Sequence, residues 1–371
     1  RKYMPASRAN FANLFINDTL WGLYTNVEAV NNEFLVDHFD SGDNTFVKGN
    51  PEHLDLNGEN SNLEYYTGST EDDYRSLYDL KSDYGWTDLF NFIDTLNNHQ
   101  DSISNVLNVD RALWMHAMNY ALVNFDSYIG YSQNYYLYMD DHGRFHPILW
   151  DLNMSLGSFR LTDNSDYYSG FTVSQASQMD PYAHYSGFSL HARPLIRNLL
   201  KVDRYRRMYM AHIRTIMEEN IASAEFENRA NTLQALIDTA VYNDSNKFYT
   251  YADFQDNINT TTSDLIDYPG LTELMNNRYS YMTGVDGYQG APTIDTTTPV
   301  FSVGGVLNVQ IDVSDANYVM VAYRTGKSEM FEYQEMFDDG LHNDGGAGDG
   351  LFGADLSVGN QVQYYFYAEN D

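Results

Sequence analysis

The segment from residue 122 to residue 157 constrains the fold more than any other part of the chain, because its apolar runs end at two aspartates. Ahead of the first one, residues 109–123 repeat apolar side chains three and four positions apart, which predicts a buried helix. Asp126 falls just past the end of that helix. A loop residue at such a position is held by a rigid scaffold and can still reach a ligand.

A hairpin is predicted between the two aspartates. Residues 134–139 (NYYLYM) are aromatic and strand-like, residues 140–143 (DDHG) have the composition of a turn, and residues 145–150 (FHPILW) return as a second strand. Asp151 ends that strand. We therefore expect the hairpin to bring Asp126 and Asp151 together.

An aspartate after a helix, an asparagine that opens a hairpin and an aspartate that closes it suit phosphoryl transfer. Asp126 would accept the proton of the attacking hydroxyl, while the oxygens of Asn134 and Asp151 would hold a divalent ion on the nucleotide phosphates. Taken singly, Asp and Asn at loop ends are most often caps or turn formers. Both interpretations remain open on residue type alone.

Motifs favour the first interpretation. The strings D-S-Y-x-G at 126–130, N-Y-Y-L-Y at 134–138 and W-D-x-N-x-x-x-G at 150–157 resemble the CotH family of secreted, atypical protein kinases, which is named after a spore coat protein. Two further blocks, at 15–35 and 193–209, also resemble this family. The resemblance implies a kinase-like α+β fold that uses ATP with Mg²⁺ or Mn²⁺.

The resemblance also implies roles for individual residues. Asp126 would be the catalytic base, and Asp151 and Asn134 would be metal ligands. Asn153 stands where many members carry a second acid, so it is a third candidate ligand with less negative charge. Gln133 replaces a histidine of the family pattern.

A lysine and a glutamate are candidates for the nucleotide side of the site. Residues 44–48 look like a short strand ending in Lys48, similar to a family strand with lysine, and this side chain would contact the ATP phosphates. The alternative is an ordinary surface lysine. Glu28 falls on a glutamate of the family pattern and would orient Lys48.

Composition restricts the class of protein. With 371 residues, of which 43% are hydrophobic, two domains are expected. A net charge of −31 argues against nucleic-acid binding, which requires clustered Lys and Arg. The absence of cysteine excludes disulfides and thiolate metal sites. There is also no run of eighteen apolar residues that would span a membrane.

Local patterns predict the remaining elements. Thr87 would cap one of the helices, and His184 and His191 are expected to be structural or exposed rather than metal ligands. The predicted elements are a hairpin at 13–27, helices at 28–39, 87–96, 193–200, 203–217, 224–241 and 271–283, and loops with a short helix at 51–83.

A second domain is predicted after a linker. Residues 1–285 would form the kinase-like domain, residues 286–298 the linker, and residues 299–371 a small all-β, immunoglobulin- or fibronectin-like sandwich. A loop in this domain carries oxygen ligands spaced by glycines that would suit Ca²⁺, or else forms a turn that binds nothing. These ligands are Asp338, Asp339, Asn343, Asp344 and Asp349.

The sequence thus predicts a secreted or cell-surface bacterial kinase that phosphorylates Ser, Thr or another hydroxyl on extracellular, matrix or surface-layer proteins. The resemblance implies that an N-terminal part of the kinase-like domain precedes residue 1. One alternative is a pseudokinase or structural component of an outer surface assembly. Another is a calcium-dependent surface- or carbohydrate-binding protein in which the β domain is the functional part.

Overall fold

The computed structural model describes residues 2–57, 59–166, 169–264, 266–295, 300–303, 306–358 and 362–370. The chain divides into two compact units. The N-terminal unit consists of residues 1–36 and 41–285, and the C-terminal unit of residues 37–40 and 286–371. The first unit combines helices with sheets and the second is built from small sheets, so the predicted fold class is confirmed.

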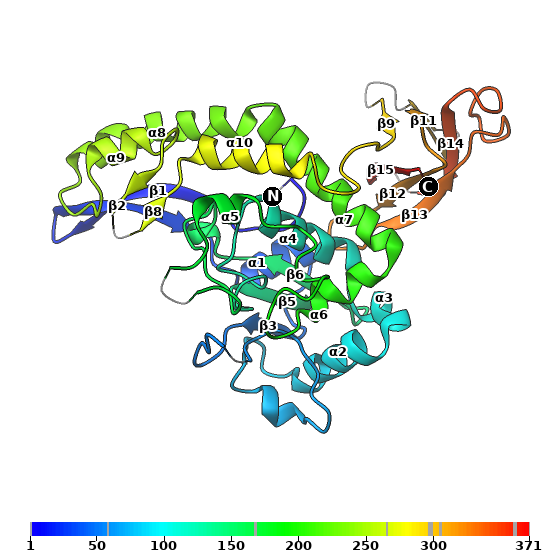
Figure 1. The fold of residues 1–371 in the computed structure, drawn as a ribbon. Helices are drawn as coiled ribbons and strands as arrows, with labels where there is room; N and C mark the ends of the chain where they lie inside the picture. Colours follow the sequence, from blue (N-terminus) through cyan, green and yellow to red (C-terminus); the bar gives the residue numbers. More distant parts are fainter. Residues whose placement is uncertain are drawn as a thin grey trace. The chain divides into compact units, whose positions relative to one another are not determined.

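A four-stranded antiparallel sheet forms the centre of the N-terminal unit (Figure 1). Its strands, in spatial order, are β4 (Tyr78–Leu80), β3 (Phe46–Gly49), β5 (Tyr135–Met139) and β6 (Phe145–Leu149). The predicted hairpin of β5 and β6 is present, with Tyr135 opposite Leu149. Pro147 is tolerated because β6 lies at the edge of the sheet and need not donate to a further strand. The sequence patterns did not reveal β4.

Helix α4 (Val109–Ala121) delivers the chain to the candidate site. The side chain of Asn108 caps it by accepting a hydrogen bond from the backbone N–H of Arg111, 3.0 Å away. Ten of its residues are buried, on all sides of the helix. Helix α4 is therefore the central helix of this unit rather than a surface helix.

Two predicted helix starts differ from the structure. Helix α1 (Asn32–Phe39) begins after Asn31, whose side chain accepts a hydrogen bond from the backbone N–H of Phe34, so Glu28 lies outside the helix. Helix α2 (Trp86–Asn98) begins after Gly85. Thr87 is inside α2 and does not cap it; its hydroxyl donates to Glu71 instead.

The other elements of this unit are short connections and the helices that follow the site. They include the short 3₁₀ helix Glu71–Tyr74, α3 (Ile103–Val106), α5 (Val173–Ser177), α6 (Pro194–Arg197), α7 (Asp203–Ile216), the π-helical turn Met217–Ala222, α8 (Glu225–Asn243), α9 (Tyr251–Asp256), α10 (Leu271–Met282), and the strand pair β7 (Thr262–Ser263) and β8 (Asp267–Tyr268). In the described part of the chain, no helix is both long enough and apolar enough to cross a bilayer.

The predicted N-terminal hairpin is present as β1 (Ala9–Ile16) and β2 (Thr19–Val27). Its two turn residues, Asn17 and Asp18, both have positive φ, as a two-residue turn with the twist of the strands requires. All residues of β1 are exposed. The hairpin is anchored to the end of α8, where Asp244 accepts a hydrogen bond from the backbone N–H of Leu23 at 2.8 Å.

The C-terminal unit is a sandwich of two antiparallel sheets. One contains β9 (Thr293–Ile294), β10 (Val300–Val303), β11 (Leu307–Ser314) and β14 (Leu351–Leu356), and the other contains β12 (Tyr318–Arg324), β13 (Glu332–Met336) and β15 (Gln363–Glu369). Buried side chains from both sheets, such as Ile311 and Val321, form one apolar core. The pair β9 and β11 shows that residues 293–294, expected in the linker, belong to a sheet, while residues 296–299 lie outside the described residues.

Candidate active site

Lys48, Asn134 and Asp151 lie at the same end of the central sheet. Lys48 is in β3, directly opposite Tyr136 of β5. Asn134 immediately precedes β5, and Asp151 comes two residues after β6. Because β5 and β6 are antiparallel, the start of one strand and the end of the other meet at this edge.

The loop after α4 brings Asp126 to the same place. The backbone N–H of Leu156 donates to the carbonyl of Leu122 at 2.8 Å, and that of Gly157 to the carbonyl of Val123 at 3.2 Å. The segment that follows Asp151 therefore runs beside the segment that precedes Asp126.

Two neighbouring amides hold Asp126 in position. The Nε2 of Gln133 donates to Oδ1 of Asp126 at 2.7 Å, and the Nδ2 of Asn134 donates to the backbone carbonyl of Asp126 at 3.1 Å. The backbone N–H of Asn134 in turn donates to the carbonyl of Gly49 at 3.1 Å. These bonds fix the carboxylate relative to β3 and β5.

The environment of the Asp126 carboxyl group raises its pKa above the ordinary value of an aspartate. Burial raises its pKa, and the negative charge of Asp151 raises it further, although hydrogen bonds from Gln133 and Asn134 act in the opposite direction. Asp151 can act on Asp126 because the segments at 122–123 and 156–157 are joined by backbone hydrogen bonds. A pKa raised toward neutrality suits a group that takes up a proton during a reaction.

Lys48 is also affected by Asp151. Partial burial of its side chain and the nearby charge of Lys81 lower its pKa, whereas the carboxylates of Asp79 and Asp151 raise it. Its Nζ lies 5.7 Å from the centre of the Tyr136 ring. Lys48 is thus a partly buried cation at the sheet end, beside Asp151, rather than a fully solvated surface lysine.

The backbone of Asn134 and Asp151 is left-handed, with φ of 56° at both residues. Asn and Asp tolerate this conformation better than other residues with a Cβ. The left-handed backbone thus gives a structural reason for Asn and Asp at these positions, in addition to a chemical one. Asparagine is the substitution of Asp151 that disturbs the backbone least.

Two candidates lie less directly at this site. Glu28 pairs with Arg8, with 3.0 Å between Oε1 and Nη2, and the carboxylates that act on Lys48 are those of Asp79 and Asp151. Asn153 is exposed on a 3₁₀ turn after Asp151. An orienting role for Glu28 and metal ligation by Asn153 stay predictions.

Sequence reasoning missed the buried ion pair that supports the Asp126 loop. Arg193 and Asp163 are almost completely buried, with 3.0 Å between Nη2 and Oδ2. The same guanidinium donates to the backbone carbonyls of Tyr128, at 3.1 Å, and Gly130, at 2.5 Å. The R-P-L-I string contains this arginine, but nothing in the string indicates its partners.

His184 and His191 make contacts within the protein, and the expectation that neither is a metal ligand stays a prediction. His184 is buried and its Nδ1 is hydrogen-bonded to the hydroxyl of Tyr120, while Nε2 of His191 contacts the carbonyl of Asn57 at 3.1 Å.

The glycine-rich loop of the C-terminal unit uses its carboxylates to bind its own backbone. Asp344 is fully buried and accepts hydrogen bonds from the N–H groups of Asp339, Gly340 and His342. Asp338 and Asp349 likewise accept from backbone N–H groups, and Asn343 has a positive φ. This pattern corresponds to the turn alternative, and the geometry does not support the Ca²⁺ prediction.

The residues at the sheet end fit a divalent ion that is completed by a nucleotide. Asn134 and Asp151 supply hard oxygen donors, and Mg²⁺ is usually held by one or two carboxylates together with substrate phosphates. Such an ion would offset the repulsion between Asp126 and Asp151 that raises the pKa of Asp126. Among the described residues, no three acidic or histidine side chains are grouped to hold a metal alone.

Comparisons with known proteins cover both units. A family model described as CotH kinase protein matches residues 3–282, a range that includes Lys48, Asp126, Asn134 and Asp151. A second model, described as conditioned medium factor 2nd Ig-like domain, matches residues 308–368. A search of curated proteins found no match.

Proposed function

Because this chain belongs to the CotH kinase protein family, we propose that it is a kinase that transfers the γ-phosphoryl group of ATP to a hydroxyl group of a protein. The observation that carries the proposal is the arrangement at one end of the central sheet, where the β5–β6 hairpin brings Asn134 near Asp151, and Gln133 and Asn134 hold Asp126 by hydrogen bonds. We place the metal-binding carboxylate of Asp151 next to both a candidate base and a candidate phosphate-binding cation, which is the set of groups that phosphoryl transfer uses.

Each residue has a role in this reaction. Asp126 accepts the proton of the attacking hydroxyl, with its carboxylate oriented by Gln133. Lys48 contacts the ATP phosphates as a compact positive charge. Asn134 and Asp151 hold Mg²⁺ or Mn²⁺, which neutralises charge on the phosphates when it is bound.

The acceptor class follows from the family rather than from the geometry. We place the acceptor, a serine, threonine or other hydroxyl, on extracellular, matrix or surface-layer proteins, and the kinase itself outside a bacterial cell or on its surface. The C-terminal sandwich is an accessory unit in this proposal. The pseudokinase alternative rests on Gln133 and Asn153, which depart from the family pattern.

Phosphoryl transfer to casein tests the proposal. The protein is incubated with ATP labelled at the γ-phosphate and with Mn²⁺ or Mg²⁺, and label on casein and on the chain itself is measured. Asp126→Asn should lower the rate by about 10²–10⁴-fold, the range expected for loss of a general base. Asp72→Asn removes a carboxylate whose side chain is 83% exposed and should leave the rate unchanged. Equal incorporation by wild type and Asp126→Asn would refute the assignment.

A further inference from the structure

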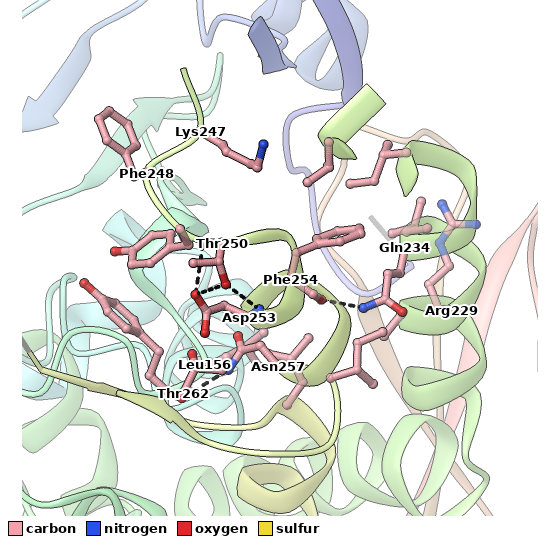
Figure 2. A pocket seen from close by; sticks show the side chains of 18 of the residues that line it. Leu156, Arg229, Gln234, Lys247, Phe248, Thr250, Asp253, Phe254, Asn257 and Thr262 are labelled. Carbon is pink, nitrogen blue, oxygen red and sulfur yellow. Dashed lines mark hydrogen bonds between the residues drawn. The ribbon is translucent and has the colours of Figure 1, made fainter. Parts of the chain in front are cut away.

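A hollow with a volume of about 570 Å³ opens in the N-terminal unit beside α8 (Figure 2). It is lined by α8, by the segment that contains α9, and by residues near the start of α10. The candidate active-site residues Lys48, Asp126, Asn134 and Asp151 do not line it. Its size falls within the range of about 300–1,000 Å³ that is typical of small-molecule sites.

The wall formed by α8 is an apolar stripe. The residues that line the hollow recur at helical spacing, and they are Phe226, Ala230, Leu233, Ile237 and Val241. A stripe of this kind normally packs against a core. Here none of the 19 residues of α8 is buried. The side chain of Phe248, also part of the lining, is 96% exposed.

The charges of the lining indicate the polar group that a ligand would carry. The one carboxylate in the lining, Asp253, already accepts hydrogen bonds from the backbone N–H and hydroxyl of Thr250, at 2.9 Å and 2.6 Å (Figure 2). The Nζ of Lys247 donates to the carbonyl of Asp244 at 2.6 Å. In the part of the chain that the structure describes, no hydrogen bond or ion pair engages the guanidinium of Arg229.

Arg229 therefore provides an exposed cation at the edge of an apolar hollow, in a chain whose net charge is −31. It also borders a second, smaller hollow of about 350 Å³, which shares Phe226 with the first. The planar fork of a guanidinium binds a carboxylate through two parallel hydrogen bonds. We propose that the hollow binds a free fatty acid, with its hydrocarbon chain along the apolar stripe of α8 and its carboxylate on Arg229.

Calorimetric titration of octanoate, decanoate and dodecanoate, each below its micelle concentration, tests the proposal on the full chain. Burial of each added methylene should raise the affinity about fourfold, which corresponds to about 0.8 kcal/mol. Dodecanol, which has the chain without the charge, should bind about tenfold more weakly than dodecanoate, because it lacks the charged hydrogen bonds.

Three variants locate the two ends of the ligand. Arg229→Gln should weaken dodecanoate binding about tenfold and leave dodecanol binding unchanged. The matched control Lys247→Gln removes the other cation of the lining and should change dodecanoate binding much less. Ala230→Trp fills the hollow and should abolish binding of both compounds, while its unchanged circular dichroism spectrum shows that the fold is kept.

Two results would overturn the proposal. One is the absence of dodecanoate binding by the wild-type protein. The other is an equal loss of affinity in Arg229→Gln and Lys247→Gln, which would indicate general electrostatic attraction rather than a carboxylate site. Neither result depends on kinase activity.

Discussion

Replacement of Gln133 by leucine should raise the pKa of Asp126. The Nε2 of Gln133 donates to Oδ1 of Asp126 at 2.7 Å, and this bond lowers a pKa that burial and Asp151 raise. A hydrogen bond to a charged group is worth about 1.5–3 kcal/mol, and one pKa unit corresponds to about 1.4 kcal/mol. Loss of the bond should therefore raise the pKa of Asp126, and a loss of that energy corresponds to a rate about 10- to 100-fold lower at pH values where most of Asp126 is protonated.

The assay is the pH dependence of phosphoryl transfer to casein. Asp126 must be deprotonated to act as a base, so a higher pKa should move the acid limb of the profile to higher pH and lower the rate on that limb. Gln133→His restores a donor at this position and should move the limb less. Gln363→Leu makes the same change in the C-terminal unit, where the glutamine contacts Arg324, and should not move it. Superimposable acid limbs for wild type and Gln133→Leu would refute the reasoning.

Three further predictions concern stability, measured as the free energy of unfolding in urea. Burial lowers the pKa of His146 from 6.5 to about 4. As the pH falls, the imidazole is therefore protonated in the unfolded chain before it is protonated in the folded protein. The free energy of unfolding should fall by about 3 kcal/mol between pH 6.5 and pH 4. His146→Gln should reduce that loss, and an unchanged pH dependence would count against it. Gly130→Ala should destabilise the protein by about 1–3 kcal/mol, because a Cβ at this position would lie 1.8 Å from a backbone carbonyl oxygen. Gly284→Ala is the control, since the nearest atom to a Cβ there is 3.5 Å away. Equal effects of the two substitutions would be inconsistent with this crowding. Arg193→Met should lower the free energy of unfolding by about 3–5 kcal/mol, because it leaves the buried carboxylate of Asp163 unpaired. Arg75→Met removes the partner of Asp72, whose side chain is 83% exposed, and should cost at most about 1 kcal/mol. Similar costs would show that burial of the ion pair is unimportant.

The sequence predicted those features that depend on contacts close along the chain. Asn17 and Asp18 form the hairpin turn because both tolerate positive φ. Alternation and turn composition were enough to predict β5 and β6, and this hairpin places Asn134 near Asp151. The helix period likewise predicted α4 within two residues of its end.

Features that depend on distant contacts were missed. Arg193 and Asp163 are 30 positions apart, and the guanidinium also binds the carbonyls of Tyr128 and Gly130, so no local pattern marks the pair. Residue type predicts Thr87 as the cap of α2, but the N-cap residue is Gly85, whose φ of 131° few other residues adopt. The period of α8 predicted a helix correctly, although it could not show that the apolar stripe stays open to solvent.

Calorimetric titration of ATP with Mg²⁺ or Mn²⁺ tests the central claim most directly, because it requires no knowledge of the acceptor. We expect wild type to bind ATP only when the metal is present and EDTA to abolish binding. Asp151→Asn, which keeps the left-handed backbone, should lose this binding, whereas Asp126→Asn should retain it. ATP binding that is equal in wild type and Asp151→Asn, or absent from wild type with either metal, would contradict the account.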